Sequence, residues 1–288
     1  MLGVTPLDST GNPGSKPLQW TIDSTGVVSQ FDNNVLTGYH GKMSSDKKLI
    51  SLVGTQNVMP YTVEMTIARK RTGTVLSNTD LASIPFAYHA LVSGSDNNWE
   101  YGAGSSNASR QLTITSMMLP PGYTMSLPPP NFDTLSVSQA GIVTLFNDNM
   151  FYGLMTDDKK VIFTIMNGPT SASSRLMVIM VTGQTFTQAD YAGAFPFVEF
   201  RNLPYLMWAF GIGSIDATGN GSYLSYQDSL LPGLLPIPPT YIRLLSATGV
   251  ITDPSDGNFH GQMSYNKDIT VQTNTIRGSH GLNIGFRR

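Results

Sequence analysis

The stretch FHGQMSYNKDIT, residues 259–270, decides the fold because the chain contains it three times. The other versions are YHGKMSSDKKLI at 39–50 and FYGLMTDDKKVI at 151–162. An aromatic residue, a glycine and a methionine persist in all three copies, while the histidine becomes tyrosine in the middle copy. This pattern is typical of a hairpin in which one strand ends at the hydroxyl, a polar turn carries the lysine, and an apolar pair opens the next strand. We therefore expect the phrase to mark the fold rather than to form an active site.

The phrase belongs to a longer unit, B, which alternates with a second unit, A. The three B copies align through Gly41, Gly153 and Gly261, which lie 112 and 108 residues apart. The A stretch FAYHALVSGSDNNWEYG (86–102) aligns without a gap to FPFVEFRNLPYLMWAFG (195–211), and LDSTGN (7–12) resembles the tail of an A unit. The sequence predicts one β-repeat domain, 1–288, with the units 1–17 (partial A), 18–82 (B), 83–130 (A), 131–190 (B), 191–238 (A) and 239–288 (B).

The fold class predicted from these units is all-β. No long window has the helical spacing of apolar residues, whereas β-branched runs bounded by Gly, Pro, Asn and Asp recur along the chain. A unit of about 50 residues has the size of a propeller blade, which favours a β-propeller of about five blade-like units. The alternative is a tandem β-sandwich or barrel whose repeat is an A+B pair of about 108 residues.

Composition narrows the classes of function. Charged residues make up 12% of the chain, about half of the usual share, and the net charge is −2, so nothing attracts nucleic acid. The absence of cysteine excludes disulfides and thiolate chemistry. No run reaches the roughly 18 apolar residues of a membrane span, and the first residues lack the basic and apolar regions of a secretory signal. We expect an extracellular or cell-surface protein whose signal sequence is not present in this chain.

No set of residues has the spacing of a catalytic or metal site. His40 and His260 occupy one repeat position, but Tyr152 replaces them in the middle copy, which favours a structural aromatic over a general base. The zinc pattern H-E-x-x-H, the nucleophile elbow G-x-S-x-G and a phosphate-binding loop are missing, and the carboxylates are scattered. The sequence thus predicts no enzyme, no cofactor and no metal, with a carbohydrate-active enzyme on a propeller as a lesser alternative.

The phrases FAYH, WEYG, SIDATG and YHGKMS resemble those that alternate in uncharacterised β-repeat, propeller-like segments of large bacterial exported and surface proteins. The resemblance covers most of the chain and attaches no named family and no activity to it. It departs from the pattern at Val198, which stands where the first A unit has His89.

Aromatic and small polar residues of the A units are the best candidates for recognition, because such residues stack on sugar faces or bind a polar protein surface. The candidate ligand-binding residues are Trp99, Tyr101, Trp208, Tyr223, Tyr226, Asp96, Asn97 and Asn98. The alternative for both tryptophans is a place in the core, since their positions match between repeats. The predicted function is a non-enzymatic, secreted or surface binding module that recognises a glycan or a protein through loops of the β-repeat scaffold, with carbohydrate binding or adhesion as its role. The alternative is a structural spacer of a larger adhesin or filament, whose partners are neighbouring repeats of a longer chain.

Overall fold

The computed structural model describes residues 2–4, 18–32, 35–56, 62–70, 72–94, 97–131, 133–146, 148–167, 173–202, 206–229, 240–276 and 278–287. These residues form three antiparallel sheets and two short 3-10 helices, η1 (Asn78–Leu81) and η2 (Gln188–Tyr191). The all-β prediction is confirmed. In the described part of the chain no helix is long and apolar enough to span a membrane.

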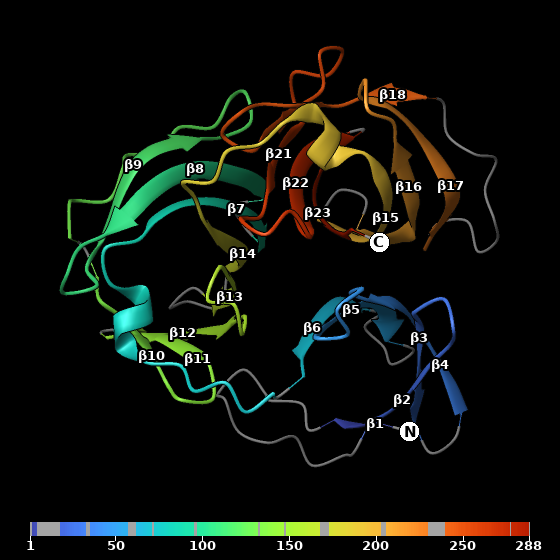
Figure 1. Cartoon of the computed structure of the whole chain (residues 1–288), viewed down its shortest axis with the longest axis horizontal. Coiled ribbons are helices and arrows are strands. Elements are labelled where there is room, and N and C mark those ends of the chain that lie inside the picture. Colours follow the sequence, from blue (N-terminus) through green and yellow to red (C-terminus); the bar gives the residue numbers. More distant parts are fainter. Residues whose placement is uncertain are drawn as a thin grey trace.

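The first sheet, which we call the N-terminal sheet, has six strands in sequence order. They are β1 (Leu2–Val4), β2 (Leu18–Ile22), β3 (Val27–Asp32), β4 (Val35–Met43), β5 (Leu49–Gln56) and β6 (Thr62–Arg69). β1 and β6 are the two ends of its strand order. Figure 1 shows this sheet in blue at the lower right.

The second sheet, the central barrel, joins an A unit to the B unit that follows it. Its strands are β7 (Pro85–Gly94), β8 (Asn98–Ser106), β9 (Leu112–Met118), β10 (Leu135–Val137), β11 (Ile142–Leu145), β12 (Asp148–Met155), β13 (Val161–Asn167) and β14 (Ser173–Val181). β14 pairs with β7, so the last strand of the B unit hydrogen-bonds to the first strand of the A unit. An isolated bridge between Gln111 and Thr134 links the far ends of the strand order, and the sheet therefore curls back on itself into a barrel-like form.

The third sheet, the C-terminal barrel, repeats this arrangement. Its strands are β15 (Gly193–Arg201), β16 (Met207–Ile215), β17 (Asn220–Asp228), β18 (Tyr241–Ile242), β19 (Leu244–Leu245), β20 (Val250–Thr252), β21 (His260–Met263), β22 (Ile269–Ile276) and β23 (Ser279–Phe286). β15 pairs with β23, and only Arg243 separates β18 from β19 at the two ends of the strand order.

The five-bladed propeller predicted from the sequence does not describe these sheets. A blade is a separate four-stranded sheet, whereas here each complete A unit and the following B unit share one sheet of eight or nine strands. The alternative predicted from the sequence, a barrel-type repeat of one A+B pair, is compatible with this topology.

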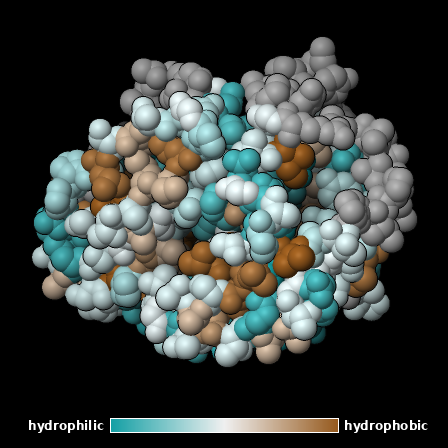
Figure 2. Space-filling view, turned by 90° about the horizontal axis from the view of Figure 1, so that it is seen from above, coloured by the Kyte–Doolittle hydropathy of each residue, from teal (hydrophilic) through white to brown (hydrophobic). Residues whose placement is uncertain are grey.

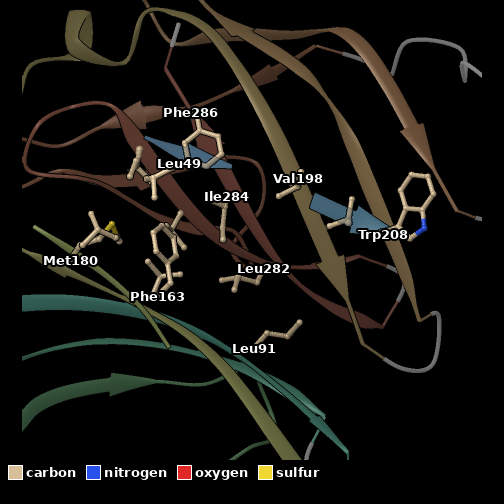
Figure 3. Packing of buried hydrophobic residues seen from close by; sticks show 14 residues of the cluster. Leu49, Leu91, Phe163, Met180, Val198, Trp208, Leu282, Ile284 and Phe286 are labelled. Carbon is tan, nitrogen blue, oxygen red and sulfur yellow. The ribbon is translucent and has the colours of Figure 1, made fainter. Parts of the chain in front are cut away.

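The outer faces of the three sheets pack against one another in a common core. On β23, Leu282, Ile284 and Phe286 point into this core and alternate with residues that line the inside of the C-terminal barrel, as the period of two in a strand requires. Leu49 and Val53 of β5 join them from the N-terminal sheet, and Figure 3 shows this packing. β7 and β8 lie against β22 and β23, while β15 and β16 lie against β5 and β6.

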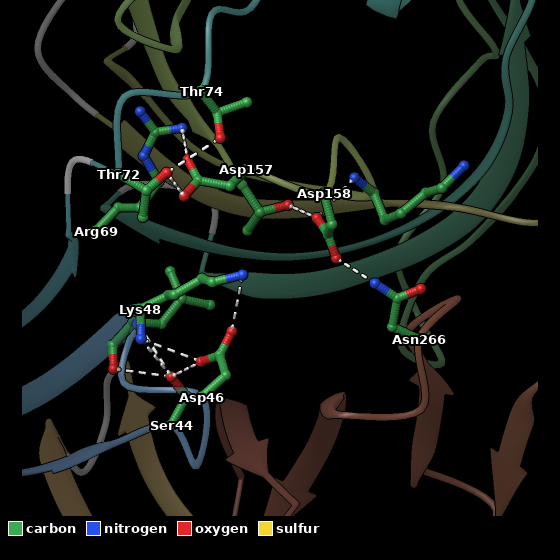
Figure 4. A network of polar contacts seen from close by, with 12 residues as sticks. Ser44, Asp46, Lys48, Arg69, Thr72, Thr74, Asp157, Asp158 and Asn266 are labelled. Atoms are coloured by element: carbon green, nitrogen blue, oxygen red, sulfur yellow. Dashed lines mark hydrogen bonds and ion pairs between the residues drawn. The ribbon is translucent and has the colours of Figure 1, made fainter.

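The thrice-repeated phrase forms the turn of a hairpin in each sheet. The hydroxyl of Ser44 accepts the backbone N–H of Leu49, five residues later, at 2.9 Å. Thr156 and Ser264 accept the equivalent N–H groups at 3.0 Å each. The turns approach one another, with the Asn266 amide donating to an Asp158 carboxylate oxygen at 2.6 Å (Figure 4). The repeated hydroxyl therefore closes a turn.

The molecular surface has a mixed hydropathy. The face in Figure 2 is mostly pale to teal, with separate brown patches between the polar regions. The exposed large hydrophobic side chains come from all three sheets or their connections and include Phe146, Ile165 and Leu224.

Candidate functional site

The two tryptophans predicted to contact a ligand are buried between sheets. Trp99 on β8 is 2% exposed and donates its indole N–H to the hydroxyl of Thr275 at 2.8 Å. Trp208 on β16 is 6% exposed and donates to the hydroxyl of Thr55 at 3.0 Å. Neither ring presents a face on which a sugar could stack. The alternative of a place in the core describes both residues, and they leave the candidate ligand surface.

Three of the other predicted residues lie near Trp99. Tyr101 is half-buried and stacks on His260, with ring centroids 4.3 Å apart. The Asn97 side chain accepts the N–H of Gly94 at 3.1 Å, and Asn98 is buried at the start of β8. These contacts belong to the junction of the two barrels and to the β7–β8 turn. Asp96 lies outside the described residues.

Tyr223 and Tyr226 form a separate aromatic cluster at the C-terminal barrel. Their ring centroids lie 5.6 Å apart, and the Tyr223 ring is 5.7 Å from Phe197 and 5.1 Å from Tyr241. The cluster joins β15, β17 and β18 on the inside of the barrel. Of the predicted residues, Tyr223 lines a cleft, and Tyr226 packs beside it without lining that cleft.

The cleft beside this cluster lies between the inner faces of β15–β18 and of β22–β23. Aromatic, polar and small residues share its lining. The lining residues are Tyr191, Phe195, Phe197, Gly213, Ile215, Tyr223, Tyr241, Arg243, Thr270, Gln272, Asn283 and Gly285. Such a mixture of aromatic faces with a few convergent polar groups is the usual composition of a small-molecule site.

The cleft exists because the third B unit carries smaller and more polar residues than the second at the same inward positions. The strand register shows that Phe197 pairs across the strands with Gly285 in the C-terminal barrel, as Tyr88 pairs with Ile179 in the central barrel. The two pairs are therefore equivalent. In the central barrel, buried Tyr88 and Ile179 belong to an apolar core that also contains Ile162. Gly285 removes the side chain that fills this space, and Thr270 stands where the central barrel has Ile162.

A buried ion pair lies beneath the cleft. Arg201 Nε is 2.7 Å from Glu199 Oε1, and both side chains are less than 9% exposed. The Asn274 amide donates to the same carboxylate oxygen at 3.1 Å. Burial raises the pKa of Glu199, but the Arg201 charge and the amide hydrogen bonds outweigh it and lower the pKa overall. Glu199 therefore stays ionised and paired.

The hydroxyl-bearing rings of the cleft remain neutral at physiological pH. Burial raises the pKa values of Tyr223 and Tyr241 above the ordinary value, so each phenol keeps its proton and can both donate and accept. The Tyr191 hydroxyl accepts a hydrogen bond from the Gln272 amide at 3.1 Å. The Arg243 guanidinium lies 4.7 Å from the Tyr241 ring centroid and pairs with Asp253. The cleft thus offers aromatic faces and neutral hydrogen-bonding groups, with its cation already paired.

Sequence reasoning did not find most of this site. The candidate ligand-binding residues do not include Arg243, Gln272 or Asn283, nor the ion pair of Glu199 and Arg201. The usable signal is a difference between repeats: Thr164 and Met177 of the second B unit become Gln272 and Asn283 in the third.

Among the residues that the structure describes, no group of three or more His, Asp or Glu side chains could hold a metal ion.

Comparisons with known proteins identify no family. No protein-family model and no curated protein matches the sequence. Among solved structures, the chain is similar to isotype 1 transferrin binding protein B from serogroup B Neisseria meningitidis, with a TM-score of 0.35 and 8% identity over 96% of this chain and 59% of that chain. A protein of unknown function from the DUF3598 family of Nostoc punctiforme gives a TM-score of 0.24 and 7% identity, over 76% of this chain and 100% of the other. The chain thus spans under two thirds of the length of the transferrin-binding relative, and the likeness to both structures is weak.

Proposed function

We propose that this protein is a non-enzymatic binding module, extracellular or on a cell surface, that holds a neutral polar ligand in the cleft of its C-terminal barrel. A saccharide unit is the ligand class that suits the lining best. Sugars combine apolar ring faces, which stack on aromatic side chains, with hydroxyls that need both donors and acceptors. Tyr223 and Tyr241 offer both kinds of contact, and Gln272 and Asn283 add amide groups.

The observation that carries the proposal is the contrast between the two barrels. Both share strand order and register, yet the central barrel has the apolar side chains of Ile162, Met177 and Ile179 at the positions where the C-terminal barrel has Thr270, Asn283 and Gly285. A barrel interior needs apolar side chains for stability, so polar and missing side chains there lower the stability of the fold. Such a loss is tolerated where these residues serve another purpose. Ligand binding is such a purpose.

The state of Glu199 favours binding over catalysis. A general acid needs a pKa near the working pH, whereas the pKa of Glu199 is lowered by its partner Arg201. The ion pair also keeps the carboxylate from acting as a free base. An enzyme on this scaffold would need a different carboxylate pair in one pocket.

The test is ligand titration with variants that fill or alter the cleft. The full chain is titrated by calorimetry against neutral monosaccharides, oligosaccharides and a cell-surface glycan panel. Thr270→Ile installs the residue that fills the central barrel, and we expect it to weaken binding at least tenfold while the protein stays folded. Tyr223→Phe removes one hydroxyl from the cleft, with Tyr123→Phe as the matched control because Tyr123 does not line the cleft.

Three outcomes would contradict this function. The first is that no sugar in the panel binds. The second is that a sugar binds equally well to the Thr270→Ile variant. The third is that the protein cleaves a polysaccharide without forming a stable complex, which would favour the carbohydrate-active enzyme.

A structural role as a unit of a larger assembly is the second candidate, because both ends of the N-terminal sheet's strand order are open among the described strands. Such edges attract further strands.

A further inference from the structure

The contact between a tryptophan of one sheet and the repeated phrase of the next sheet occurs twice. Trp99 of the central barrel lies 5.1 Å from the His260 ring of the C-terminal barrel. Trp208 of the C-terminal barrel lies 5.0 Å from the His40 ring of the N-terminal sheet. Each indole also donates to a threonine on the strand next to that histidine. The two contacts are therefore copies of one docking geometry.

A third position of the same kind is open on the central barrel. Tyr152 pairs with Ile165 across β12 and β13, as His40 pairs with Val53 and His260 with Thr273. Val53 and Thr273 are 0% exposed, whereas Ile165 is 44% exposed. Among the described residues no aromatic ring stacks on Tyr152. Within the described part of the chain the platform is present, but no tryptophan strand lies on it as β8 and β16 lie on its two counterparts.

The strand order of the N-terminal sheet shows where that strand belongs. In the C-terminal barrel, β15 and β16 lie between β17 and β23, and in the central barrel β7 and β8 lie between β9 and β14. The strands of the N-terminal sheet that correspond to β17 and β23 are β1 and β6, which are the two ends of its strand order, and no described strand pairs with the outer edge of either one. Among its described strands this sheet thus has no counterpart of the two-stranded hairpin that carries the tryptophan in both barrels.

Lys47 of the N-terminal sheet has no counterpart, among the described residues, of the ion pairs that the equivalent lysines of the two barrels form. Lys159 and Lys267, in the second and third copies of the phrase, pair with Asp80 and Asp190 at 2.8 and 2.9 Å. Both aspartates belong to the 3-10 helices that directly precede the hairpins β7–β8 and β15–β16. Lys47 has the same left-handed backbone, with φ of 60° against 65° in both other copies, and is exposed. It forms no ion pair with any residue that the structure describes.

We propose that the open edge of β6, Lys47 and the Tyr152–Ile165 platform form one docking surface for a partner polypeptide that supplies an A-type hairpin. The partner carries an acidic 3-10 turn followed by two strands, the second with the pattern Trp-x-(Tyr/Phe)-Gly. Its first strand adds to β6 by main-chain hydrogen bonds, which is the β-augmentation mode of recognition. Its aspartate reaches Lys47, its tryptophan covers Ile165 and packs against Tyr152, and its Tyr or Phe stacks on Tyr152, as Phe210 and Tyr101 stack on the two histidines. Each of the three features has two filled counterparts: the edges of β14 and β23, the ion pairs of Lys159 and Lys267, and the tryptophan contacts at His40 and His260. The occupant therefore follows from contacts that this chain already makes.

This inference concerns residues that do not line the cleft and does not depend on the proposed function. The probe is a synthetic polypeptide with the sequence of residues 77–106, which contains Asp80 and Trp99, with a 5-fluorotryptophan at position 99. It is titrated against the full chain and followed by fluorine NMR. In a second format the same sequence is joined to the N-terminus through a flexible linker, which raises its local concentration to about the millimolar range.

We expect saturable 1:1 binding, a fluorine shift, and slower hydrogen exchange of backbone amides in β6. Ile165→Asp should weaken binding at least tenfold, whereas Leu224→Asp, which alters a similarly exposed side chain on β17, should leave it unchanged. Lys47→Glu should weaken binding, and a probe with Asp80→Lys should recover affinity for that variant only.

The proposal is overturned if the tethered probe causes neither a fluorine shift nor protection of β6. It is also overturned if Ile165→Asp binds the probe as tightly as the parent chain does. Self-association of the chain without any probe, abolished by Ile165→Asp, would assign the surface to a second copy and refute a separate partner.

Discussion

The buried imidazole of His89 should make stability depend on pH between pH 7 and pH 5. His89 lies on β7 at the junction of the two barrels, is 3% exposed, has its Nδ1 3.1 Å from the Thr273 hydroxyl, and stacks on Tyr101. Burial, with a smaller contribution from the nearby His260, lowers the pKa of His89 to about 3. An unfolded histidine has a pKa of about 6.5, so below pH 6.5 the unfolded state binds a proton that the folded state does not.

The sign and the size of the effect follow from this difference. Because the unfolded state binds more protons, the free energy of unfolding falls as the pH falls. Each pH unit well below 6.5 removes about 1.4 kcal/mol, so the loss from pH 7 to pH 5 is about 2 kcal/mol for this one residue. The loss stops only near the folded pKa of about 3.

The assay is urea denaturation at pH 7 and pH 5 with a substitution that the chain itself suggests. The aligned residue of the second A unit is Val198, which is fully buried, so His89→Val keeps an apolar side chain of tolerable size. The comparison is made in a Thr273→Val background, so that no hydroxyl loses its partner. His40, His260 and His280, whose pKa values burial also lowers, contribute to both proteins and cancel. We expect the histidine-containing protein to lose about 2 kcal/mol more between the two pH values. Equal losses in the two proteins would refute the reasoning.

Two further substitutions test the packing of the repeats. Trp208→Phe removes the indole hydrogen bond to Thr55 while keeping an aromatic ring, and we expect a loss of about 1 kcal/mol in urea denaturation, against about 3–5 kcal/mol for Trp208→Ala. A Trp208→Phe effect that Thr55→Val leaves unreduced would argue against the hydrogen bond as its cause. Gly41→Ala should lower the melting temperature more than Gly153→Ala, because an added Cβ at Gly41 would lie 2.3 Å from the Ser51 carbonyl oxygen, while the nearest atom at Gly153 is 3.1 Å away. Equal shifts for both glycines would contradict this account of the repeated glycine.

The repeated phrase was predictable from the sequence because its interactions are local. The hydroxyls of Ser44, Thr156 and Ser264 bond to backbone groups only five residues away, so identical local sequences form identical turns. Sequence reasoning therefore recovered the all-β class and the hairpin character of the phrase. The rings of His40 and His260, for which the sequence favours a structural aromatic, pack against Trp208 and Trp99.

The candidate site was only partly predictable, since a strand's alternation identifies two faces but does not say what each face meets. Trp208 and Tyr223 both lie on strands of an A unit, yet one packs against another sheet and the other lines a cleft. Here one face of a strand lies inside a barrel and the other packs against a neighbouring sheet. Both faces therefore carry apolar and aromatic residues, and the sequence pattern does not distinguish them. The signal in the sequence is the difference between repeats, in which Ile162, Thr164 and Met177 of the second B unit become Thr270, Gln272 and Asn283 in the third.

What the sequence alone determined is the repeat, its strands and its turns, because these depend on interactions within a few residues. What only the tertiary structure decided is how the units combine. The pairings of β14 with β7 and of β15 with β23 join residues about 80 to 95 positions apart, and no local pattern encodes such partners. A period of about 50 residues fits a blade and a period of about 108 fits a barrel equally well until those two pairings are known. The same long-range pairings place Trp99 and Trp208 on neighbouring sheets and leave Ile165 exposed.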